Sequence, residues 1–431
     1  MFWRFGGAAS AVVCVVGLLA VGCGDSPASS NNDSPNNGFI TPNNDTPSEC
    51  TSNDECEDAE KPFCNLETFA CEPLPEGHLI GIGDGSAGSV EFTTIYNPQA
   101  GYQATDLEFN PERPEELWVL QRQPHSQFPC TQDNPSPLGC GALEGVMALV
   151  TNPGLTGQTE VQSKVDPNSW HFMRRPPALA FGAGSTFGTC GEARTGNFLD
   201  GGPDFIGPTL WSSDLAIFAQ DPGPGLNGSH LDMLHATPYC MGIAHEEANI
   251  YWTFNGNIGS LDRYDFVMDH GPGHADHSDG EVYRYIPGEL SRVPDVPSHM
   301  VWDKEAKMLY VADTGNGRVG RFNPEGTVQV GDISPIYEPL AFNGLFEGGE
   351  LVDIVPPGTL EHPSGLEMHD GILYVSDNAT GIIHAFDKEG NKLRQLQTEL
   401  TDGGLAGMTI GPDGKLYIAD LTDSKVYRID P

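Results

Sequence analysis

Histidine and aspartate gather in one part of this 431-residue chain. Six of the 13 histidines lie between His230 and His277, and the densest stretch, residues 268–285, reads MDHGPGHADHSDGEVYRY. Its candidate metal ligands are Asp269, His270, His274, Asp276, His277 and Asp279. Imidazole together with carboxylate is a ligand set for Zn, Cu, Ni or Fe, whereas carboxylates alone favour Ca²⁺. The alternative is a solvated turn in which the aspartates bond their own backbone.

A second group of such side chains comes shortly before this loop. Residues 229–247 contain His230, Asp232, His235, Tyr239 and Cys240, a mixture that is unusual for a plain connector, and they include His245 near their end. The ending His245-Glu246-Glu247 has only half of the H-E-x-x-H zinc motif. The chain also lacks a nucleophile elbow, a P-loop and a dinucleotide-binding fingerprint. The stretch is therefore another candidate for the functional region, without a complete motif.

Three stretches near the C-terminus align with one another and indicate the elements that position these residues. Each has an apolar strand, a charged turn, the pattern Leu-Tyr-(Val/Ile)-(Ala/Ser)-Asp, a tight polar turn and a third strand. The pattern ends at Asp313, Asp377 and Asp420, so the spacings are 64 and 43 residues, and we assign residues 335–357 to an insertion in the first stretch. Such spacing suits the blades of a propeller, which must stack around an axis to bury their faces.

The repeated pattern resembles the NHL-repeat family of β-propellers over the last third of the chain. Weaker copies begin near Ala104, Pro177 and Met241, which gives six blades, and residues 89–96 could close the ring beside the last blade. We therefore expect an all-β protein with a six-bladed propeller over residues 78–431. Five or seven blades, or another all-β architecture, are the alternatives.

The starts of the inner strands are the expected place for chemistry, because in propellers they converge on the mouth of the central channel. Small residues there would leave room for a ligand, which Asp106 and His299 could contact. His362, Arg174 and Arg175 would lie on the rim of the same mouth. The alternative is that glycine only permits close packing and that His299 is structural. The aligned repeats place the following residues at these starts: Asp106, Ala178, Gly242, His299, Gly365 and Gly407.

Two hypotheses about function follow from the resemblance. The first is a propeller that binds a small molecule, metal or peptide at the channel mouth. The second is a metal-dependent lyase or hydrolase, since the chain also resembles peptidyl-hydroxyglycine amidating lyases and lactonase-like propellers. That resemblance implies Zn²⁺ or Ca²⁺, rather than Cu, held by His299 and His362 with His235 or His245, and a metal-bound water as the reactive group. The glycines at several channel positions favour the binding hypothesis.

The cysteines predict an oxidised, exported protein. Cys14 leaves with a signal peptide and Cys23 is modified, so eight remain, and an even number predicts four disulfides. The first four form a small module at residues 49–74, with three possible pairings; a zinc knuckle is disfavoured because tight C-x₂-C pairs are absent. This module resembles those after the stalk of myxobacteria-like surface lipoproteins. Cys130 and Cys140 bracket a Pro-rich loop and should pair, which leaves Cys190 with Cys240. The cysteines concerned are Cys50, Cys56, Cys64, Cys71, Cys130, Cys140, Cys190 and Cys240.

The N-terminus predicts export and a lipid anchor. Residues 1–22 carry one positive charge, Arg4, before a short apolar run, which is typical of a signal peptide. The run ends in Leu-Ala-Val-Gly-Cys23, which resembles a bacterial lipobox and implies acylation of Cys23; ordinary signal cleavage is the alternative. Residues 23–48 are a polar stalk that we expect to be disordered. Gly24 after Cys23 favours the outer membrane or cell surface over retention in the inner membrane.

The net charge of −39, from 60 acidic and 21 basic residues, excludes a nucleic-acid partner. A phosphate backbone would be repelled, and no basic stripe compensates. The expected partners are the membrane, through the lipid on Cys23, and an unidentified small-molecule, peptide or protein ligand. Most of the acidic residues serve as a solubilising surface.

Overall fold

The computed structural model describes residues 50–123, 144–196 and 204–431. The chain divides into two compact units, and the boundary along the sequence falls between Glu72 and Pro73. The expected signal peptide, Cys23 and stalk lie outside the described residues, as do Cys130 and Cys140. No helix within the described ranges has the length and apolar character needed to cross a membrane. The helical elements are all short: α1 (Ser169–Phe172) and the 3₁₀ turns η1 (Asn53–Glu55), η2 (His78–Ile80), η3 (Ala87–Ser89) and η6 (Thr314–Asn316).

The first unit is a small disulfide-bonded module. Its strands β1 (Phe63–Asn65) and β2 (Ala70–Glu72) pair antiparallel. Two disulfides, Cys50–Cys64 and Cys56–Cys71, hold the segment together in place of an apolar core. This pairing is one of the three that the sequence left open, and because all four sulfurs are bonded to each other the module has no thiolate for zinc.

The second unit contains six sheets, and the strand order in each runs from the centre outward. The first two are β4-β5-β6-β7 (Gln103–Asn110, Arg113–Arg122, Val146–Thr151, Thr159–Lys164) and β8-β9-β10-β11 (Leu179–Phe181, Thr186–Thr189, Thr209–Ser212, His230–Met233). The next two are β12-β13-β14-β15-β20-β19 (Cys240–His245, Ile250–Asn255, Ser260–Asp265, Glu281–Tyr285, Phe342–Glu347, Val328–Asp332) and β16-β17-β18-β21 (Met300–Asp303, Met308–Asp313, Arg318–Asn323, Glu350–Val355). The last two are β22-β23-β24-β25 (Pro363–His369, Ile372–Asp377, Ile382–Asp387, Lys392–Gln397) and β26-β27-β28-β3 (Leu405–Ile410, Leu416–Asp420, Lys425–Asp430, Glu91–Tyr96).

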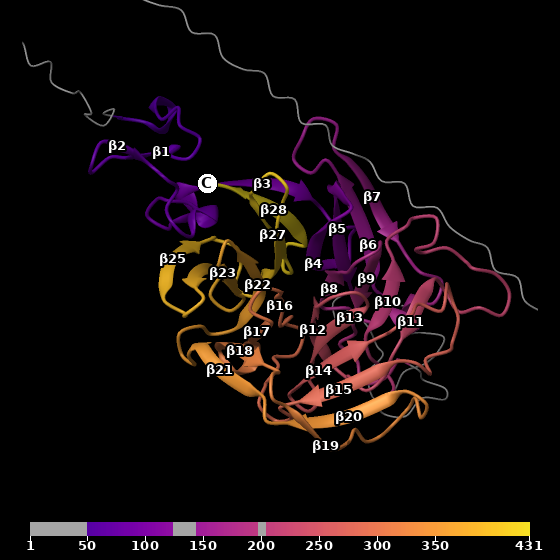
Figure 1. Cartoon of the computed structure of the whole chain (residues 1–431). Helices are drawn as coiled ribbons and strands as arrows, with labels where there is room; N and C mark the ends of the chain where they lie inside the picture. The colour runs from indigo at the N-terminus through magenta and orange to yellow at the C-terminus, as the bar shows by residue number, and fades with distance from the viewer. Residues whose placement is uncertain (1–49, 124–143, 197–203) are drawn as a thin grey trace, which may run out of the picture. The chain divides into compact units, whose positions relative to one another are not determined.

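The six sheets are the blades of a propeller. Their inner strands contact one another in the circular order β4, β8, β12, β16, β22 and β26, and β26 contacts β4 again. Figure 1 shows β4, β8, β12, β16 and β22 around a common centre, with β11, β19, β21 and β25 at the periphery. The ring is closed by β3, which pairs antiparallel with β28 of the last blade. The predicted six-bladed propeller and its closing strand from residues 89–96 are thus confirmed.

The Leu-Tyr-Val-type strands explain how adjacent blades adhere. Alternation along β17 turns Leu309 and Val311 toward the preceding blade, where they pack with Met241 and Trp252. Tyr310 turns the other way and packs with Leu373 of the following blade. The same alternation recurs in β23 and β27, where Tyr374 and Tyr417 are buried against the next blade. Each strand therefore carries two apolar faces, one for each neighbour.

The aspartate that ends the Leu-Tyr-Val-type strand forms hydrogen bonds with the segment that connects one blade to the next. Asp313 accepts a hydrogen bond from the Ser291 backbone N–H at 2.8 Å and an ion pair from Arg318 at 2.7 Å. Asp377 accepts from the backbone N–H groups of Glu361 and His362 at 2.8 and 3.0 Å. Each of these two aspartates ends the second strand of its blade and holds the segment that leads into the first strand of the same blade. This shared structural role explains why the aspartate recurs in the repeats.

The predicted insertion at residues 335–357 has different bounds in the structure. Its last part is β21, the outer strand of its own blade, and the additional chain is instead the hairpin β19–β20. This hairpin extends the neighbouring blade, because β20 pairs parallel with the outer edge of β15. Pairing the backbone groups of that edge satisfies donors and acceptors that would otherwise be exposed.

Candidate functional site

The propeller axis is closed where the inner strands begin, which corrects the prediction of an open mouth there. Gly242, Gly365 and Gly407 do lie at matching positions, but a Cβ on Gly407 would lie 2.3 Å from Oδ1 of Asp106. On Gly242 and Gly365 a Cβ would lie 2.0 and 2.1 Å from carbonyl oxygens of the next inner strand. The glycines at these three positions therefore permit close packing of the inner strands, as the alternative interpretation expected.

A buried ion network covers the same end of the axis. Glu192 accepts from Arg122 at 2.7 Å and from Arg292 at 3.0 Å, and Asp295 pairs with Arg175. The Arg122 guanidinium also donates to the Asp295 carbonyl, although its blade and the one that follows Asp295 stand on opposite sides of the ring. Arg175, expected on an open rim, is 2 % exposed and belongs to this closure.

An axial cavity of about 320 Å³ lies toward the other end of the inner strands. Its walls include Glu108, His245, Trp302 and Glu367 from four blades, and Asp106 and His299 also line it. Burial raises the pKa of Glu367 to about 7 and raises the pKa of Glu108 well above its usual range. The neighbouring carboxylates add to both shifts, because each disfavours a further negative charge. The cavity thus favours protonated acids over a set of free carboxylates.

A second cavity, of about 460 Å³, lies away from the axis, and we call it the rim pocket. It adjoins β11, the outermost strand of its blade, and segments from two blades contribute to it. Its lining residues are His171, Phe172, Phe205, Asn227, His230, His235, Ala275, Asp276, His277, Ser278, Tyr337, Glu338, Pro339 and Leu340. Rings dominate this set, and among these lining residues there is no lysine or arginine.

The imidazoles of the rim pocket are fixed in one orientation. Nδ1 of His171 bonds the Gly196 carbonyl at 2.7 Å, Nδ1 of His277 bonds Asp232 at 2.5 Å, and Nδ1 of His235 bonds Glu338. A carbonyl or carboxylate oxygen only accepts, so each Nδ1 carries a proton, and the neutral form of such a ring keeps its lone pair on Nε2. Nε2 of His235 is buried and has no hydrogen-bond partner among the described residues.

Ring stacking completes this orientation. The His235 ring lies on Phe205 with centroids 3.7 Å apart, and the His230 ring lies on Phe172 at 3.6 Å. Burial lowers the pKa of His171 to about 4 and that of His230 to about 3, so both are neutral at physiological pH. With Glu338 among its walls, the pocket is rich in hydrogen-bond acceptors, and its described walls contain no lysine or arginine.

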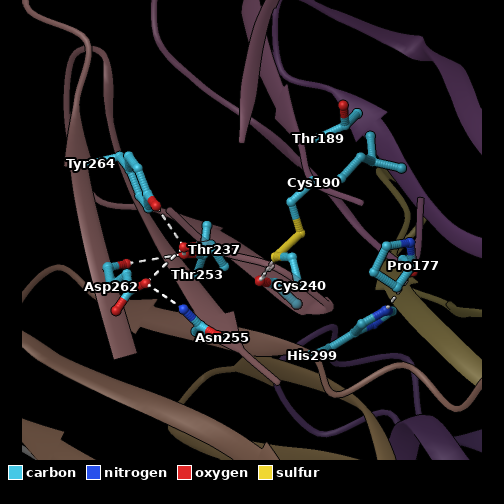
Figure 2. Close-up of a disulfide and its surroundings, with 12 residues drawn as sticks. Pro177, Thr189, Cys190, Thr237, Cys240, Thr253, Asn255, Asp262, Tyr264 and His299 are labelled. Carbon is cyan, nitrogen blue, oxygen red and sulfur yellow. Dashed lines mark hydrogen bonds between the residues drawn. A yellow bond between two sulfur atoms is a disulfide. The ribbon is translucent and has the colours of Figure 1, made fainter. Parts of the chain in front are cut away.

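Two features hold the segment that carries His235, and the first is its attachment to the adjacent blade. The disulfide Cys190–Cys240 ties the start of β12 to the end of β9 in the adjacent blade (Figure 2). The Ile206 carbonyl accepts the backbone N–H groups of Ala236 and Thr237, both at 3.0 Å. The chain immediately after His235 is thereby attached to the loop that supplies Phe205.

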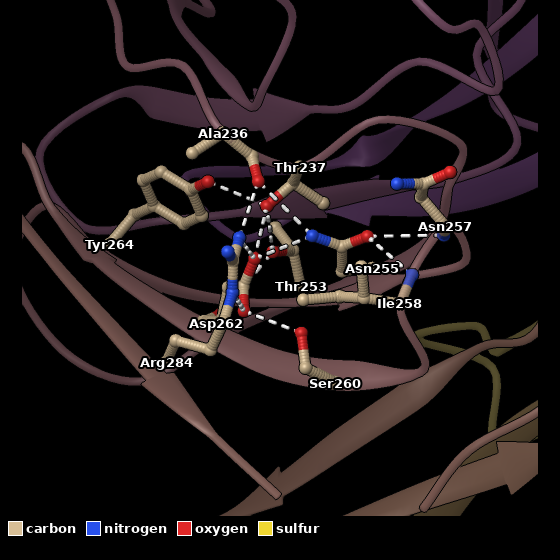
Figure 3. Close-up of polar contacts among 10 residues, drawn as sticks. All are labelled: Ala236, Thr237, Thr253, Asn255, Asn257, Ile258, Ser260, Asp262, Tyr264 and Arg284. Atoms are coloured by element: carbon tan, nitrogen blue, oxygen red, sulfur yellow. Dashed lines mark hydrogen bonds and ion pairs between the residues drawn. The ribbon is translucent and has the colours of Figure 1, made fainter. Parts of the chain in front are cut away.

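The second feature is a buried polar network around Asp262 (Figure 3). This fully buried carboxylate pairs with Arg284 at 2.7 Å and accepts from Thr237 Oγ1, also at 2.7 Å. Asn255 donates to both Asp262 and the Ala236 carbonyl. Burial alone would raise the pKa of Asp262, but the ion pair with Arg284 and the hydrogen bonds outweigh it, so the pKa is lowered. The network fixes the backbone immediately after His235.

The predicted histidine-aspartate loop divides into outward and inward side chains. Asp269, His274 and Asp276 are exposed, and two of them bond their own loop backbone, as the solvated-turn alternative requires. His270, His277 and Asp279 instead face Asp232 of β11: His270 Nε2 lies 2.8 Å from Asp279 Oδ1 and 3.9 Å from Asp232 Oδ2. The loop is also held by the bond from the Gly273 backbone N–H to the His230 carbonyl, 2.8 Å long.

The structure therefore brings the histidine-aspartate loop together with the first part of the stretch at residues 229–247 and separates both from the starts of the inner strands. His235 and His277 share the rim pocket, whereas Asp106, His245 and His299 line the axial cavity and His362 lines neither. Within the described ranges, converging ligand atoms occur at Asp232, His270 and Asp279 and among disulfide-bonded cysteines, and not on the axis. No motif in the sequence pointed to His171, Phe172, Phe205, Tyr337 and Glu338, which are among the pocket residues.

Among the comparisons with known proteins, only the one with solved structures finds matches. No family model and no curated protein matches the sequence. An auxiliary nutrient binding protein from Bacteroides ovatus is 10% identical, with a TM-score of 0.49 over 79% of this chain and 76% of that one. A streptogramin B lyase is 12% identical (TM-score 0.42, 79% and 97% covered), and a gluconolactonase from Xanthomonas campestris is 14% identical (0.40, 84% and 95%). Identities this low carry no information about the ligand of this chain.

Proposed function

We propose that this protein is an exported propeller that binds a small molecule in its rim pocket. The observation that carries the proposal is the buried Nε2 of His235, which has no hydrogen-bond partner in the part of the chain that the structure describes and belongs to a residue that lines a 460 Å³ cavity. A buried acceptor without a partner costs about 1–3 kcal/mol, and a ligand that donates to it recovers this energy. The site differs from the channel mouth that the sequence suggested.

The walls define the chemical class of the ligand. Phe172, Phe205 and Tyr337 offer faces for a ring, while the imidazole Nε2 atoms and Glu338 offer acceptors. An anion would find no lysine or arginine among the described lining residues, and the acidic surface would repel it. The ligand we infer is a neutral or cationic ring compound that bears N–H or O–H donors.

Calorimetry on the full-length protein with charge-matched pairs tests this class. Tyramine and glucosamine are the donor-bearing probes, and 4-hydroxyphenylacetate and glucuronate are their anionic counterparts. We expect at least one of the first pair to bind and neither of the second. Binding of the anions alone, or binding of a donor probe that persists unchanged in His235→Phe, would refute the proposal.

A second candidate function is general-base catalysis in the same pocket, as in a hydrolase or lyase. Glu338 bonds Nδ1 of His235 and so leaves Nε2 to take a proton, the arrangement that orients a catalytic imidazole. Mass spectrometry of each bound probe after incubation would detect turnover. If turnover occurs, Glu338→Gln should lower kcat more than it changes KM.

We further propose that Cys23 carries the lipid that anchors the protein in the outer membrane. The disulfides of the described residues support export, because such bonds persist in oxidising compartments. Metabolic labelling with palmitate tests the anchor: Cys23→Ala should lose the label and leave the membrane fraction. Label that persists in Cys23→Ala would contradict it.

A further inference from the structure

The cluster of Asp232, His270 and Asp279 beside the rim pocket has a geometry suited to a metal ion. One ligand atom from each residue lies within 4.8 Å of the others. Asp232 comes from the outer strand β11, and the other two come from the loop that crosses it. Carboxylate and imidazole ligands in this combination are those of transition-metal dications.

An independent observation shows that the cluster is incomplete without a ligand. The Asp232 side chain is fully buried, yet its Oδ2 has no hydrogen-bond partner among the described residues. This oxygen lies 3.9 Å from Nε2 of His270, so it is directed into the cluster. Oδ2 of Asp279 is likewise buried without a partner. Two unsatisfied carboxylate oxygens at one imidazole are costly unless a cation joins them.

The surroundings already provide the support that a metal ligand needs. His277 Nδ1 and the Met233 backbone N–H both donate to Oδ1 of Asp232, at 2.5 and 2.7 Å, and so leave Oδ2 available. Such outer contacts orient the ligating atom. The side chains of His270 and Asp279 are 17 and 28 % exposed, so water can reach the cluster and complete the coordination shell.

We propose that Asp232, His270 and Asp279 bind one transition-metal dication such as Zn²⁺ or Mn²⁺. The ion ties the loop to the outer edge of its blade. His277 contacts both the ligand Asp232 and the rim pocket, so the ion also fixes one wall of that pocket. The site requires no ligand in the rim pocket and is independent of the proposed function.

Titration of the chelator-treated full-length protein with ZnCl₂ and, separately, MnCl₂ tests the site by calorimetry. We expect one equivalent of at least one ion to bind, and Asp279→Asn and Asp232→Asn each to weaken it at least about ten-fold, since each removes a charged ligand. Asp269→Asn is the matched control on the same loop, because Asp269 is exposed and bonds only the Gly271 backbone N–H in the structure. It should bind as the wild type does.

Two results would overturn the proposal: neither ion binds stoichiometrically, or an ion binds with unchanged affinity in both ligand variants. Proteolysis gives a second measurement if a variant is unstable, since the bound ion should protect residues 268–280 from cleavage in the wild type, and lack of protection would also contradict the site. His235→Phe distinguishes this site from the rim pocket. It should abolish binding of the organic probes and leave metal binding intact.

Discussion

Nδ1 of His299 lies 3.5 Å from Oδ1 of Asp106, and the two residues come from inner strands on opposite sides of the propeller ring. Nε2 of His299 donates to the Pro177 carbonyl at 3.3 Å, so the neutral ring turns its Nδ1 lone pair toward Asp106. Burial lowers the pKa of His299 to about 4 and raises the pKa of Asp106 well above its usual range. We expect the pair to be uncharged, with the carboxyl proton directed at the imidazole.

Asp106→Asn tests this charge state. Asp106 accepts the backbone N–H groups of Leu107 and Leu179 with separate oxygens, and asparagine can accept only one of them well. The variant should therefore lose about 1–3 kcal/mol of unfolding free energy near pH 5. Because the folded pKa is raised, the wild type loses stability as pH rises and its acid ionises, so the deficit should narrow toward pH 9. Urea unfolding at both pH values measures the deficit, and a deficit that stays constant between pH 5 and pH 9 would show that Asp106 is already ionised at pH 5.

Glu367→Gln should stabilise the protein in alkaline solution. The folded pKa of Glu367 is raised from 4.5 to about 7, so its contribution to stability is complete below the unfolded value and is lost as pH rises through 7. Near pH 8 the variant should exceed the wild type by up to about 3 kcal/mol in unfolding free energy, and near pH 4 the two should agree. The exposed Glu347→Gln is the control, and equal pH profiles for wild type and Glu367→Gln would contradict the shift.

Asp262→Asn should destabilise the segment that carries His235. It breaks the buried pair with Arg284, which costs about 3–5 kcal/mol because the guanidinium is left uncompensated. The double variant Asp262→Asn/Arg284→Met should cost less than the single one, since no buried charge remains. Urea midpoints give both values. If the unfolding free energy of the single variant lies within about 0.5 kcal/mol of the wild-type value, the network does not stabilise the fold.

Removing the disulfide between blades should lower the free energy of unfolding, because the unfolded chain gains conformational entropy. Cys190 and Cys240 are separated by 50 residues, and closing a loop of that length corresponds to about 4 kcal/mol in the chain-entropy model. Cys190→Ser/Cys240→Ser should show this loss in urea unfolding under non-reducing conditions. A loss below about 1 kcal/mol would mean that the surrounding backbone bonds already fix the connection.

The sequence predicts the propeller well because each repeat reflects the packing of a blade against its neighbours and the turns within that blade. The Leu-Tyr-Val-type strands must face two neighbouring blades, and Asp313, Asp377 and Asp420 end strands that turn sharply, so both leave a periodic trace. The hairpin β19–β20 leaves none, because its attachment to β15 is a parallel pairing between distant segments. That pairing accounts for the wrong bounds of the predicted insertion.

The functional site shows the same limit. His235 and His277 stand in histidine-rich stretches that composition reveals, but Tyr337 and Glu338 reach the rim pocket only through the segment between β19 and β20. His171 lies in a four-residue helix without a motif. The expectation of an open mouth failed for a different reason: glycines at the axis suit a cavity and close backbone packing equally, and only the geometry distinguishes them.

The central claim is that the rim pocket, rather than the axial cavity, binds the ligand. It is tested most directly by measuring the Kd of the tighter donor probe for wild type, His235→Phe and Glu108→Gln by calorimetry. His235→Phe keeps a ring against Phe205 but removes Nε2, whereas Glu108→Gln alters only the axial cavity. We predict a Kd at least about ten-fold higher for His235→Phe, as for a lost hydrogen bond in a buried site, and an unchanged Kd for Glu108→Gln. The reverse pattern, with affinity lost in Glu108→Gln and kept in His235→Phe, would contradict it.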